Sequence, residues 1–458
     1  MWWPHVGRKH QRSWVLLLAL WVVRGGAEYS GEVSFCAGKV GPCTVVRNEG
    51  AREVEKGCLA SLSQARAKLS GCGVGERWRP YNSTHSLATA GVFRVTIRVN
   101  DVYARPITGA WVWVDPGDPR AVQTGSNGVA EVELLTLKTN LIVVRHAKFG
   151  RAQPLFAYVH GTTNFQVTLP WRQDCRIATY NLNGYYPWST AQRTSLARVL
   201  WTVQPDIILA QESRTNELSL ADFCTRYLRG YYYAQSPEGG PIRNGLIACF
   251  PLTNVVSAGA AVMTRDVYSA RVLSEELEDA RVCCVHFKAY KGEAEAAIRD
   301  AEAQFTAAYC SSAVARGELV ILGGDMNEDI ADPTWLSHVH SILASGIPGV
   351  MRLDATDDAG SPVTYPSWGS RLDYLYVSTN VHELIVTGRV FRTDTMLQRP
   401  PWLAWNESMI ASDHTLVYAD ITVVPEPALA ASLFAGAVLV QTLRRRGALR
   451  SLGVTRKA

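Results

Sequence analysis

The sequence predicts a large α/β domain preceded by a small all-β sandwich. From Cys175 to about residue 424, strand-like and helix-like segments alternate, whereas residues 89–170 contain only short alternating apolar runs. The chain has 458 residues, of which 47% are hydrophobic and 9% aromatic. Such a length and composition indicate a folded chain of two or three domains, each with a core of its own.

The net charge of +5 does not predict a nucleic-acid partner. Ten of the 46 basic residues lie in residues 1–27 and 444–458, which contain no acidic residue. The middle of the chain therefore carries 36 basic and 41 acidic residues, a net charge of −5. Overall basicity says nothing about the substrate.

The first segment, residues 1–27, has the pattern of a secretory signal peptide. A basic stretch precedes an apolar run from Trp14 to Val23, and the small residues Gly25 and Ala27 follow it. An uncleaved anchor or a buried helix is the alternative. We expect export.

The second segment, residues 28–86, is rich in cysteine and contains Cys36, Cys43, Cys58 and Cys72. One helix-like stretch, 49–69, offers little core of its own, so we expect two disulfides to stabilise the segment in an oxidising compartment. Zinc is the alternative, but no C-x-x-C pair and no nearby histidine support it.

The third segment, residues 89–170, is predicted to form antiparallel strands of a β-sandwich. Runs such as "GVFRVTIRVND" and "NLIVVRHA" are separated by turn residues, including "TGSNG" at 124–128. Its strand pattern is similar to Ig-like or carboxypeptidase-regulatory-like modules, which serve as spacers. Trp111 and Trp113 could form a sugar-binding face, but we favour a packing role.

The fourth segment, residues 174–424, begins with two strand-like runs, "RIATYNL" and "DIILAQES". Between them, "STAQRTSLARVLWTV" predicts a helix with Ser189 or Thr190 as its cap. Its apolar stripe consists of Leu196, Val199, Leu200 and Val203. A longer Ala-rich helix is expected from about Glu293 to Arg316, before the strand-like run "LVILGGD". Cys283 and Cys284 are adjacent on a strand and should point to opposite faces.

Polar residues lie at or just beyond the ends of the apolar strands of this segment. They are Asn181, Glu212, His286, Asp325, Asn327, Asp373, Asp413 and His414. One edge of a β-sandwich can gather them into a single site. Carboxylate and amide oxygens bind Mg²⁺ or Mn²⁺, and a histidine oriented by an aspartate can take a proton from water. Such a set suits hydrolysis of phosphate esters.

The ordered series "TYNLNG", "PDIILAQES", "NGLIACF", "VHFKAY", "LGGDMN", "RLDYLYVS" and "SDHTLVYADI" resembles the endonuclease/exonuclease/phosphatase superfamily. The resemblance covers about residues 174–424. It implies a four-layered α/β sandwich, in which two mixed sheets lie face to face with helices outside, and a metal-dependent phosphoric ester hydrolase.

The same resemblance implies a site for a divalent cation, Mg²⁺ or Mn²⁺. Glu212 of "QES" would be the principal ligand and Asn181 of "NLN" would lie beside it. Asp413 of "SDH" would belong to the same metal shell.

The resemblance also implies the catalytic roles. Asp325 and Asn327 of "GDMN" would position the attacking water and hold the scissile phosphate. His414 would be the general base or would stabilise the transition state, oriented by Asp373. His286 would donate a proton or a hydrogen bond to the phosphate. A fold without activity is the alternative.

Two residues depart from the motifs of AP endonucleases within this superfamily. Ala289 stands where AP endonucleases carry an asparagine, so abasic-site repair is not expected. Asn183 stands where they carry an aspartate, which argues against a second metal site. Aromatic and arginine residues in the loops could stack bases and contact phosphates. They are Tyr185, Tyr186, Trp188, Trp368, Arg389, Arg392, Arg399, Trp402 and Trp405. We favour nucleic acid over a lipid or a small phosphoester.

The last segment, residues 425–458, resembles the PEP-CTERM sorting signal of Gram-negative bacteria. Pro425-Glu426-Pro427 is followed by an uncharged stretch, Ala428 to Leu443, and by three arginines. The resemblance implies an exosortase as a processing partner and contact with the inner membrane; a plain membrane anchor is the alternative. We therefore expect an exported, envelope-tethered nuclease, with a lipid phosphodiesterase or a non-catalytic surface protein as alternatives.

Overall fold

The structure, a computed structural model, describes residues 91–424 apart from 116–120, 137–138, 159–163, 215–219, 239 and 380–382. The predicted signal peptide, the region of Cys36, Cys43, Cys58 and Cys72, and the sorting segment 425–458 lie outside the described residues. Within the described part of the chain, no helix is both long and apolar enough to cross a membrane.

The first seven strands form a module of two sheets, in the orders β4-β1-β7 and β3-β2-β5-β6. The strands are β1 (Val92–Asp101), β2 (Trp111–Val114), β3 (Ala121–Gln123), β4 (Val129–Leu135), β5 (Thr139–Arg145), β6 (Leu155–Tyr158) and β7 (Asn164–Leu169). Side chains of both sheets, such as Ile97 and Val112, share one core. Membership of an Ig-like or carboxypeptidase-regulatory-like class stays a prediction.

One strand pair of this module differs from the expected antiparallel arrangement. β7 pairs with β1 in parallel, with Ile97 opposite Phe165. A hairpin forces antiparallel pairing, but the whole second sheet separates β1 from β7 along the chain, so no hairpin fixes the direction of β7.

The rest of the described chain forms a seven-stranded sheet, β10-β11-β9-β8-β20-β19-β17, and a six-stranded sheet, β12-β13-β14-β15-β18-β16. The first sheet consists of β8 (Cys175–Asn181), β9 (Ile207–Arg214), β10 (Tyr232–Gln235), β11 (Ile242–Ala248), β17 (Ala355–Thr356), β19 (Glu383–Phe391) and β20 (Leu416–Val424). The second consists of β12 (Leu252–Ala258), β13 (Val267–Ser274), β14 (Glu278–His286), β15 (Leu319–Asp325), β16 (Val350–Arg352) and β18 (Asp373–Ser378). Both sheets mix parallel and antiparallel pairs.

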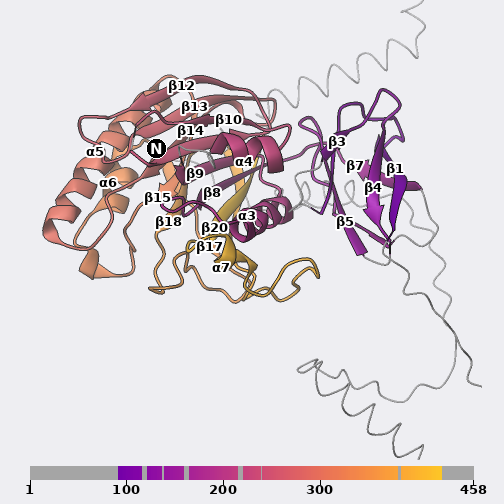
Figure 1. Cartoon of the computed structure of the whole chain (residues 1–458). Coiled ribbons are helices and arrows are strands. Elements are labelled where there is room, and N and C mark those ends of the chain that lie inside the picture. Colours follow the sequence, from indigo (N-terminus) through magenta and orange to yellow (C-terminus); the bar gives the residue numbers. More distant parts are fainter. Residues whose placement is uncertain are drawn as a thin grey trace, which may run out of the picture. The chain divides into compact units, whose positions relative to one another are not determined.

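These two sheets lie face to face, with helices on their outer faces (Figure 1). Leu209 of the first sheet and Ile321 of the second belong to one buried cluster between them. The helices are α3 (Thr190–Val203), α4 (Leu220–Tyr227), α5 (Glu293–Ala315), α6 (Val339–Gly346), α7 (Glu407–Ala411) and the short 3₁₀ helix η1 (Pro333–Trp335). α3 and α4 cover the seven-stranded sheet, and α5 and α6 cover the six-stranded sheet.

The predicted helices and strand faces agree closely with the structure. Ser189, not Thr190, caps α3, because its side chain accepts a hydrogen bond from the Gln192 N–H at 3.1 Å. The expected apolar stripe of α3 is buried. Cys283 packs under the helices and Cys284 packs between the sheets, as the strand period requires.

The β module packs directly on the α/β domain through tryptophan side chains. Trp113 is only 1% exposed, and its ring centroid lies 4.0 Å from that of Trp201 in α3. Trp113, Leu141 and Val143 of the module belong to the same buried cluster as the side chains of α3. The preferred packing role of Trp113 is confirmed, and the module is more than a spacer.

A buried ion cluster joins the same two parts. Asp206, which precedes β9, accepts hydrogen bonds from Arg145 and Arg151 of the module and from Arg172 between β7 and β8, and the Arg151 contact is 2.9 Å long. Burial would raise the pKa of Asp206, but Arg145, Arg172 and Arg151 lower it to about 2. The carboxylate is therefore ionised at neutral pH.

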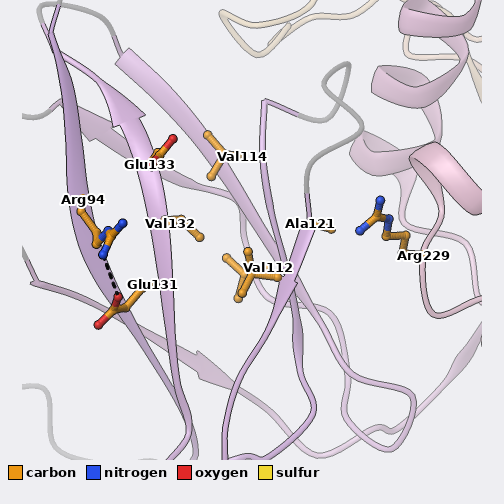
Figure 2. A pocket seen from close by; sticks show the side chains of 9 residues that line it. Arg94, Val112, Val114, Ala121, Glu131, Val132, Glu133 and Arg229 are labelled. Carbon is orange, nitrogen blue, oxygen red and sulfur yellow. Dashed lines mark ion pairs between the residues drawn. The ribbon is translucent and has the colours of Figure 1, made fainter.

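The module also contains a hollow of about 600 Å³ between the β2–β3 and β4 edges of its two sheets. Figure 2 shows side chains that line it, among them the apolar Val112 and Val132, and the ion pair between Arg94 and Glu131. That pair is 3.9 Å long and largely exposed. None of the predicted site residues lines this hollow.

Candidate active site

All eight predicted site residues meet at one edge of the two facing sheets. Asn181 ends β8 and Glu212 lies near the end of β9, while Asp413 and His414 come just before β20. The other sheet contributes residues at the same edge, namely the last residue of β14, the last residue of β15 and the first residue of β18. They are His286, Asp325 and Asp373, and Asn327 follows two residues after β15.

Strand register places three of these side chains in one row. His286 is opposite Asp325, and Asp325 is opposite Asp373. Gly324 permits this close approach, because a Cβ at that position would lie 2.0 Å from the Val285 backbone oxygen. Gly324 of "LGGD" thus helps to form the site.

His414 lies between two carboxylates. Its Nδ1 is 2.8 Å from Asp373 Oδ2, and its Nε2 is 3.7 Å from Asp325 Oδ2. Burial would lower the pKa of His414, but Asp373 and then Asp325 raise it to about 10. Asp373 therefore fixes the ring orientation and stabilises the imidazolium form, as the predicted orienting role requires.

The pKa of Asp325 is shifted as well. Its carboxylate accepts hydrogen bonds from the Asn181 amide at 3.2 Å and from the Asn327 N–H at 2.9 Å. Burial and, to a smaller extent, the charge of Asp373 raise its pKa to about 7, although the charge of His414 opposes the shift. A buried carboxyl group with a strongly shifted pKa in a cavity is typical of functional sites.

His286 is a neutral hydrogen-bond donor. Burial lowers its pKa well below the usual value, and the positive charges of Arg265 and His414 lower it further. Its Nδ1 has no partner among the described residues, whereas Nε2 lies 3.5 Å from Asp325 Oδ2 and 3.9 Å from Glu212 Oε1. We therefore assign the proton to Nε2, the nitrogen that faces acceptors.

Asn327 is held in a left-handed backbone conformation with φ of 47°. Its amide donates a hydrogen bond to the Phe287 carbonyl oxygen at 3.0 Å. The amide has one more N–H and a carbonyl oxygen with which to contact a ligand. A non-glycine residue with positive φ beside a catalytic cluster is typical of active sites.

Glu212 also has a left-handed backbone, with φ of 52°. The loop after β8 packs tightly on it, because a Cβ at Gly184 would lie 1.9 Å from the Glu212 backbone oxygen. Burial raises the pKa of Glu212, Asp413 raises it further, and a hydrogen bond with Asn181 opposes the shift. The carboxylate thus sits in a place where a cation would stabilise it.

The predicted ligands fit a hard divalent cation. Asn181, Glu212 and Asp413 offer only amide and carboxylate oxygens, which Mg²⁺ prefers. Ligand atoms of Asp325, Asp373 and His414 also lie within 4.8 Å of one another. In that second set, however, His414 Nδ1 and Asp373 already form a hydrogen bond, so the first set is the better candidate.

The site opens into a cavity of about 380 Å³. Tyr185 and Trp368 line it, as predicted for recognition residues. Four of the charged or aromatic lining residues were not predicted. They are Arg265, Lys288, Tyr290 and Tyr365. Lys288 and Tyr290 belong to the quoted motif "VHFKAY", so their closeness to His286 in sequence was a usable signal; Arg265 had none.

Several predicted recognition residues lie elsewhere. Trp188 is 1% exposed and donates a hydrogen bond to the Leu182 carbonyl oxygen, so it is a core residue. Trp402 packs on α3 through a hydrogen bond to Thr202. Arg389 and Arg392 line a different surface hollow. In the long segment before "SDH", Trp402 thus packs on the domain, whereas Trp405 is 60% exposed.

Sequence comparison identifies the family of the chain. The Endonuclease/Exonuclease/phosphatase family matches residues 178–414, which include all eight site residues. The chain belongs to this family. Family members are hydrolases that act on phosphoester bonds, and they typically depend on a divalent metal. No curated protein matches the chain.

Solved structures with similar folds share little sequence with this family member. TDP2 from Caenorhabditis elegans is 19% identical, with 54% of this chain and 74% of that chain covered and a TM-score of 0.41. The human nocturnin catalytic domain with bound sulfate is 18% identical, with 55% and 96% covered and a TM-score of 0.40. A mannosyl-6-phosphatase from Bacteroides thetaiotaomicron is 14% identical, with 54% and 99% covered and a TM-score of 0.41.

Proposed function

We propose that this chain is an exported, envelope-tethered, divalent-metal-dependent phosphodiesterase, a nuclease that hydrolyses extracellular DNA or RNA. One observation carries the enzymatic part: His414 lies between Asp373 and Asp325, and His414 and Asp325 line the same cavity as Glu212. Each of these groups has a role in attack of water on a phosphodiester, and the arrangement needs no covalent nucleophile.

The side chains divide the chemical work. Asp325 and Asn327 hold the attacking water and the scissile phosphate. Because its pKa is about 10, His414, oriented by Asp373, is an imidazolium that stabilises the charge that develops on the phosphate; it can take the proton of the water only after it has lost its own. His286 donates its Nε2–H to a phosphate oxygen.

Asn181, Glu212 and Asp413 would hold the cation, Mg²⁺ or Mn²⁺. When bound, the cation supplies positive charge that neutralises the phosphate oxygens. The acidic cavity would otherwise repel a phosphodiester, since Glu212, Asp325 and Asp413 all line it.

Side chains around the cavity support nucleic acid as the substrate. Tyr185, Tyr290 and Trp368 are exposed by 57%, 66% and 55%, so their rings are available for stacking on bases. Arg265 and Lys288 line the same cavity and can contact phosphates. The same exposed rings favour a second candidate, a phospholipid or sphingomyelin-type phosphodiesterase, because they could also contact lipid.

Export and tethering rest on the sequence of the two ends. The signal-like segment 1–27, the cysteines of residues 28–86 and the PEP-CTERM-like segment 425–458 support an envelope location with an exosortase and the inner membrane as partners. Fractionation of cells of a Gram-negative host, with and without residues 425–458, tests this part.

Hydrolysis assays test the activity. The purified protein is incubated with plasmid DNA, RNA or sphingomyelin, with Mg²⁺ or EDTA, beside Glu212→Ala and the exposed control Glu238→Ala. We expect nucleic-acid cleavage that EDTA and Glu212→Ala abolish and Glu238→Ala preserves. Cleavage of sphingomyelin alone would establish the lipid enzyme. No cleavage of any substrate, with nucleic acid still bound, would establish a binding protein.

A further inference from the structure

One side of the active-site cavity carries cations without carboxylate partners. Arg265 and Lys288 line the cavity, and neither forms an ion pair with a described carboxylate. The Arg265 guanidinium makes only long contacts, of 3.5 and 3.4 Å, with the backbone oxygens of His286 and Phe287. Lys288 Nζ lies 5.4 Å from the Tyr290 ring centroid. Glu212, Asp325 and Glu302 attract Arg265 only from beyond ion-pair distance, so both cations can still meet an anionic group.

The backbone that carries these cations has no regular sheet partners. β14 ends at His286, and β13 begins only at Val267. The backbone of Tyr290 has a φ of 77°, a value that residues other than glycine seldom adopt. Buried backbone groups outside a sheet must find other partners, or their desolvation destabilises the fold. Something else must therefore hold these segments in place.

Glu302 on α5 holds both segments at once. Its two carboxylate oxygens accept hydrogen bonds from the Thr264 N–H at 2.6 Å and from the Lys288 N–H at 2.7 Å. The side chain is completely buried. Hydrogen bonds to a buried carboxylate are roughly twice as strong as neutral ones, so Glu302 ties the residue before Arg265 to Lys288 itself.

Arg299, one turn earlier on α5, holds the same loop from its carbonyl side. Its guanidinium donates to the carbonyl oxygens of Lys288 at 3.0 Å, Tyr290 at 2.6 Å and Trp335 at 3.0 Å. This side chain is also completely buried. Because residues three apart on a helix lie on one face, Arg299 and Glu302 reach the loop side by side.

We propose that Arg299 and Glu302 are positioning residues that present Arg265 and Lys288 to an anionic group of the substrate. The two buried charges act on the strength of substrate binding, not on bond cleavage. This inference deepens the proposed function and rests on it, since a phosphate in the cavity is the group that the cations would meet. Burial of Arg299 and Glu302 destabilises the fold because both charges lose their water. Apolar residues at these positions would avoid this desolvation penalty, so stability alone does not explain the two charges.

Binding of inorganic phosphate to the full chain tests the proposal without any turnover. Isothermal titration calorimetry is run in Mg²⁺ on the wild type, Glu302→Gln, Arg299→Lys and the double variant Arg265→Gln/Lys288→Gln. Thr306→Val is the matched control, because Thr306 is also completely buried on α5 and has no hydrogen-bond partner among the described residues. Urea unfolding of each protein shows whether it is folded.

We expect phosphate to bind about tenfold more weakly to Glu302→Gln and to the double variant, with a smaller dependence of Kd on salt in both, and Thr306→Val to match the wild type. Arg299→Lys keeps the charge but loses the planar fork, so it should lie between and provides the test if Glu302→Gln does not fold. Wild-type Kd values in folded Glu302→Gln or Arg299→Lys would overturn the proposal, as would a wild type that binds no phosphate. Phosphate binding with no hydrolysis by the wild type would instead contradict the proposed function alone.

Discussion

At the scale of single residues, the charge state of the site follows from its burial. Asp373, His414 and Asp325 are each at most 6% exposed. His414 lies within hydrogen-bond distance of Asp373 and within ion-pair distance of Asp325. In water, two carboxylates and an imidazole would titrate independently near their usual values. Inside the domain, burial raises the pKa of Asp325 to about 7, and the charges of Asp373 and Asp325 raise the pKa of His414 to about 10.

Loss of the Asp373 carboxylate should reduce turnover while leaving binding intact. Asp373→Asn removes the negative charge beside His414 Nδ1, so the imidazolium form loses its main stabilisation, although the amide oxygen can still accept a hydrogen bond. We expect kcat to fall about 100-fold or more, with KM little changed, in steady-state assays on the preferred substrate. Tyr376→Phe, also on β18 and buried, should keep the wild-type kcat. Equal losses in both variants would mean that strand packing, not the carboxylate, sets the rate.

At the scale of secondary structure, the parallel β14–β15 pair determines whether the site exists. The register of these strands places His286 opposite Asp325, and the glycine before Asp325 leaves room for the adjacent backbone. Both strands are apolar because helices cover one face and the other sheet covers the other. The polar residues therefore begin where the cover ends.

Gly324→Ala should damage both stability and activity. The added Cβ would lie 2.0 Å from the Val285 backbone oxygen, so β14 must move away from β15. We expect unfolding free energy to fall by about 1–3 kcal/mol, and kcat to fall because His286 moves with its strand. Denaturant unfolding and kinetics measure the two effects. At Gly125 a Cβ meets nothing closer than 3.4 Å, so Gly125→Ala should change neither.

At the scale of the whole molecule, the β module and the α/β domain share a core and an ion cluster. Trp113 packs on Trp201, and Asp206 accepts hydrogen bonds from two arginines of the module and from Arg172, which follows it. A spacer would keep its own core and contact its neighbour through a polar surface. Here we expect the two parts to unfold together.

Trp113→Ala tests this shared core. The substitution leaves a cavity against α3, and we expect the unfolding free energy of the full chain to fall by about 3–5 kcal/mol. Trp171 is 46% exposed on the same module, so Trp171→Ala should cost much less. Denaturation followed by near-ultraviolet circular dichroism measures both. Two separate transitions in the wild type would contradict a shared core.

The ion cluster predicts a specific pH dependence of stability. The pKa of Asp206 is about 2 in the folded chain against a usual 3.8, so its ionised form stabilises the fold above pH 3.8. This stabilisation is lost as pH falls through about 2. We expect Asp206→Asn to be less stable than the wild type at pH 7, and the difference to shrink between about pH 4 and pH 2. A constant difference in melting temperature across this range would rule out the titration of Asp206 as its origin.

Much of this protein could be predicted from local sequence, because the predicted features depend on neighbours in the chain. The helix cap at Ser189 and the apolar stripe of α3 follow from spacing, and the alternation of Cys283 and Cys284 follows from the strand period. The eight site residues could be named because each ends or precedes an apolar strand. Their motifs, taken in order, indicated the family, and the family match over residues 178–414 confirms it.

Only the tertiary structure decided which residues from different segments meet. Trp188 and Trp402 are aromatic residues near motifs, yet they pack in the core and on α3, whereas Arg265, without any motif, lines the cavity. The parallel direction of β7 and the burial of Trp113 against α3 were likewise set by contacts between distant parts of the chain. Sequence determines what a segment can form and which chemistry it carries. Which side chains face one cavity depends on how the sheets and loops pack, and that packing is a property of the whole chain.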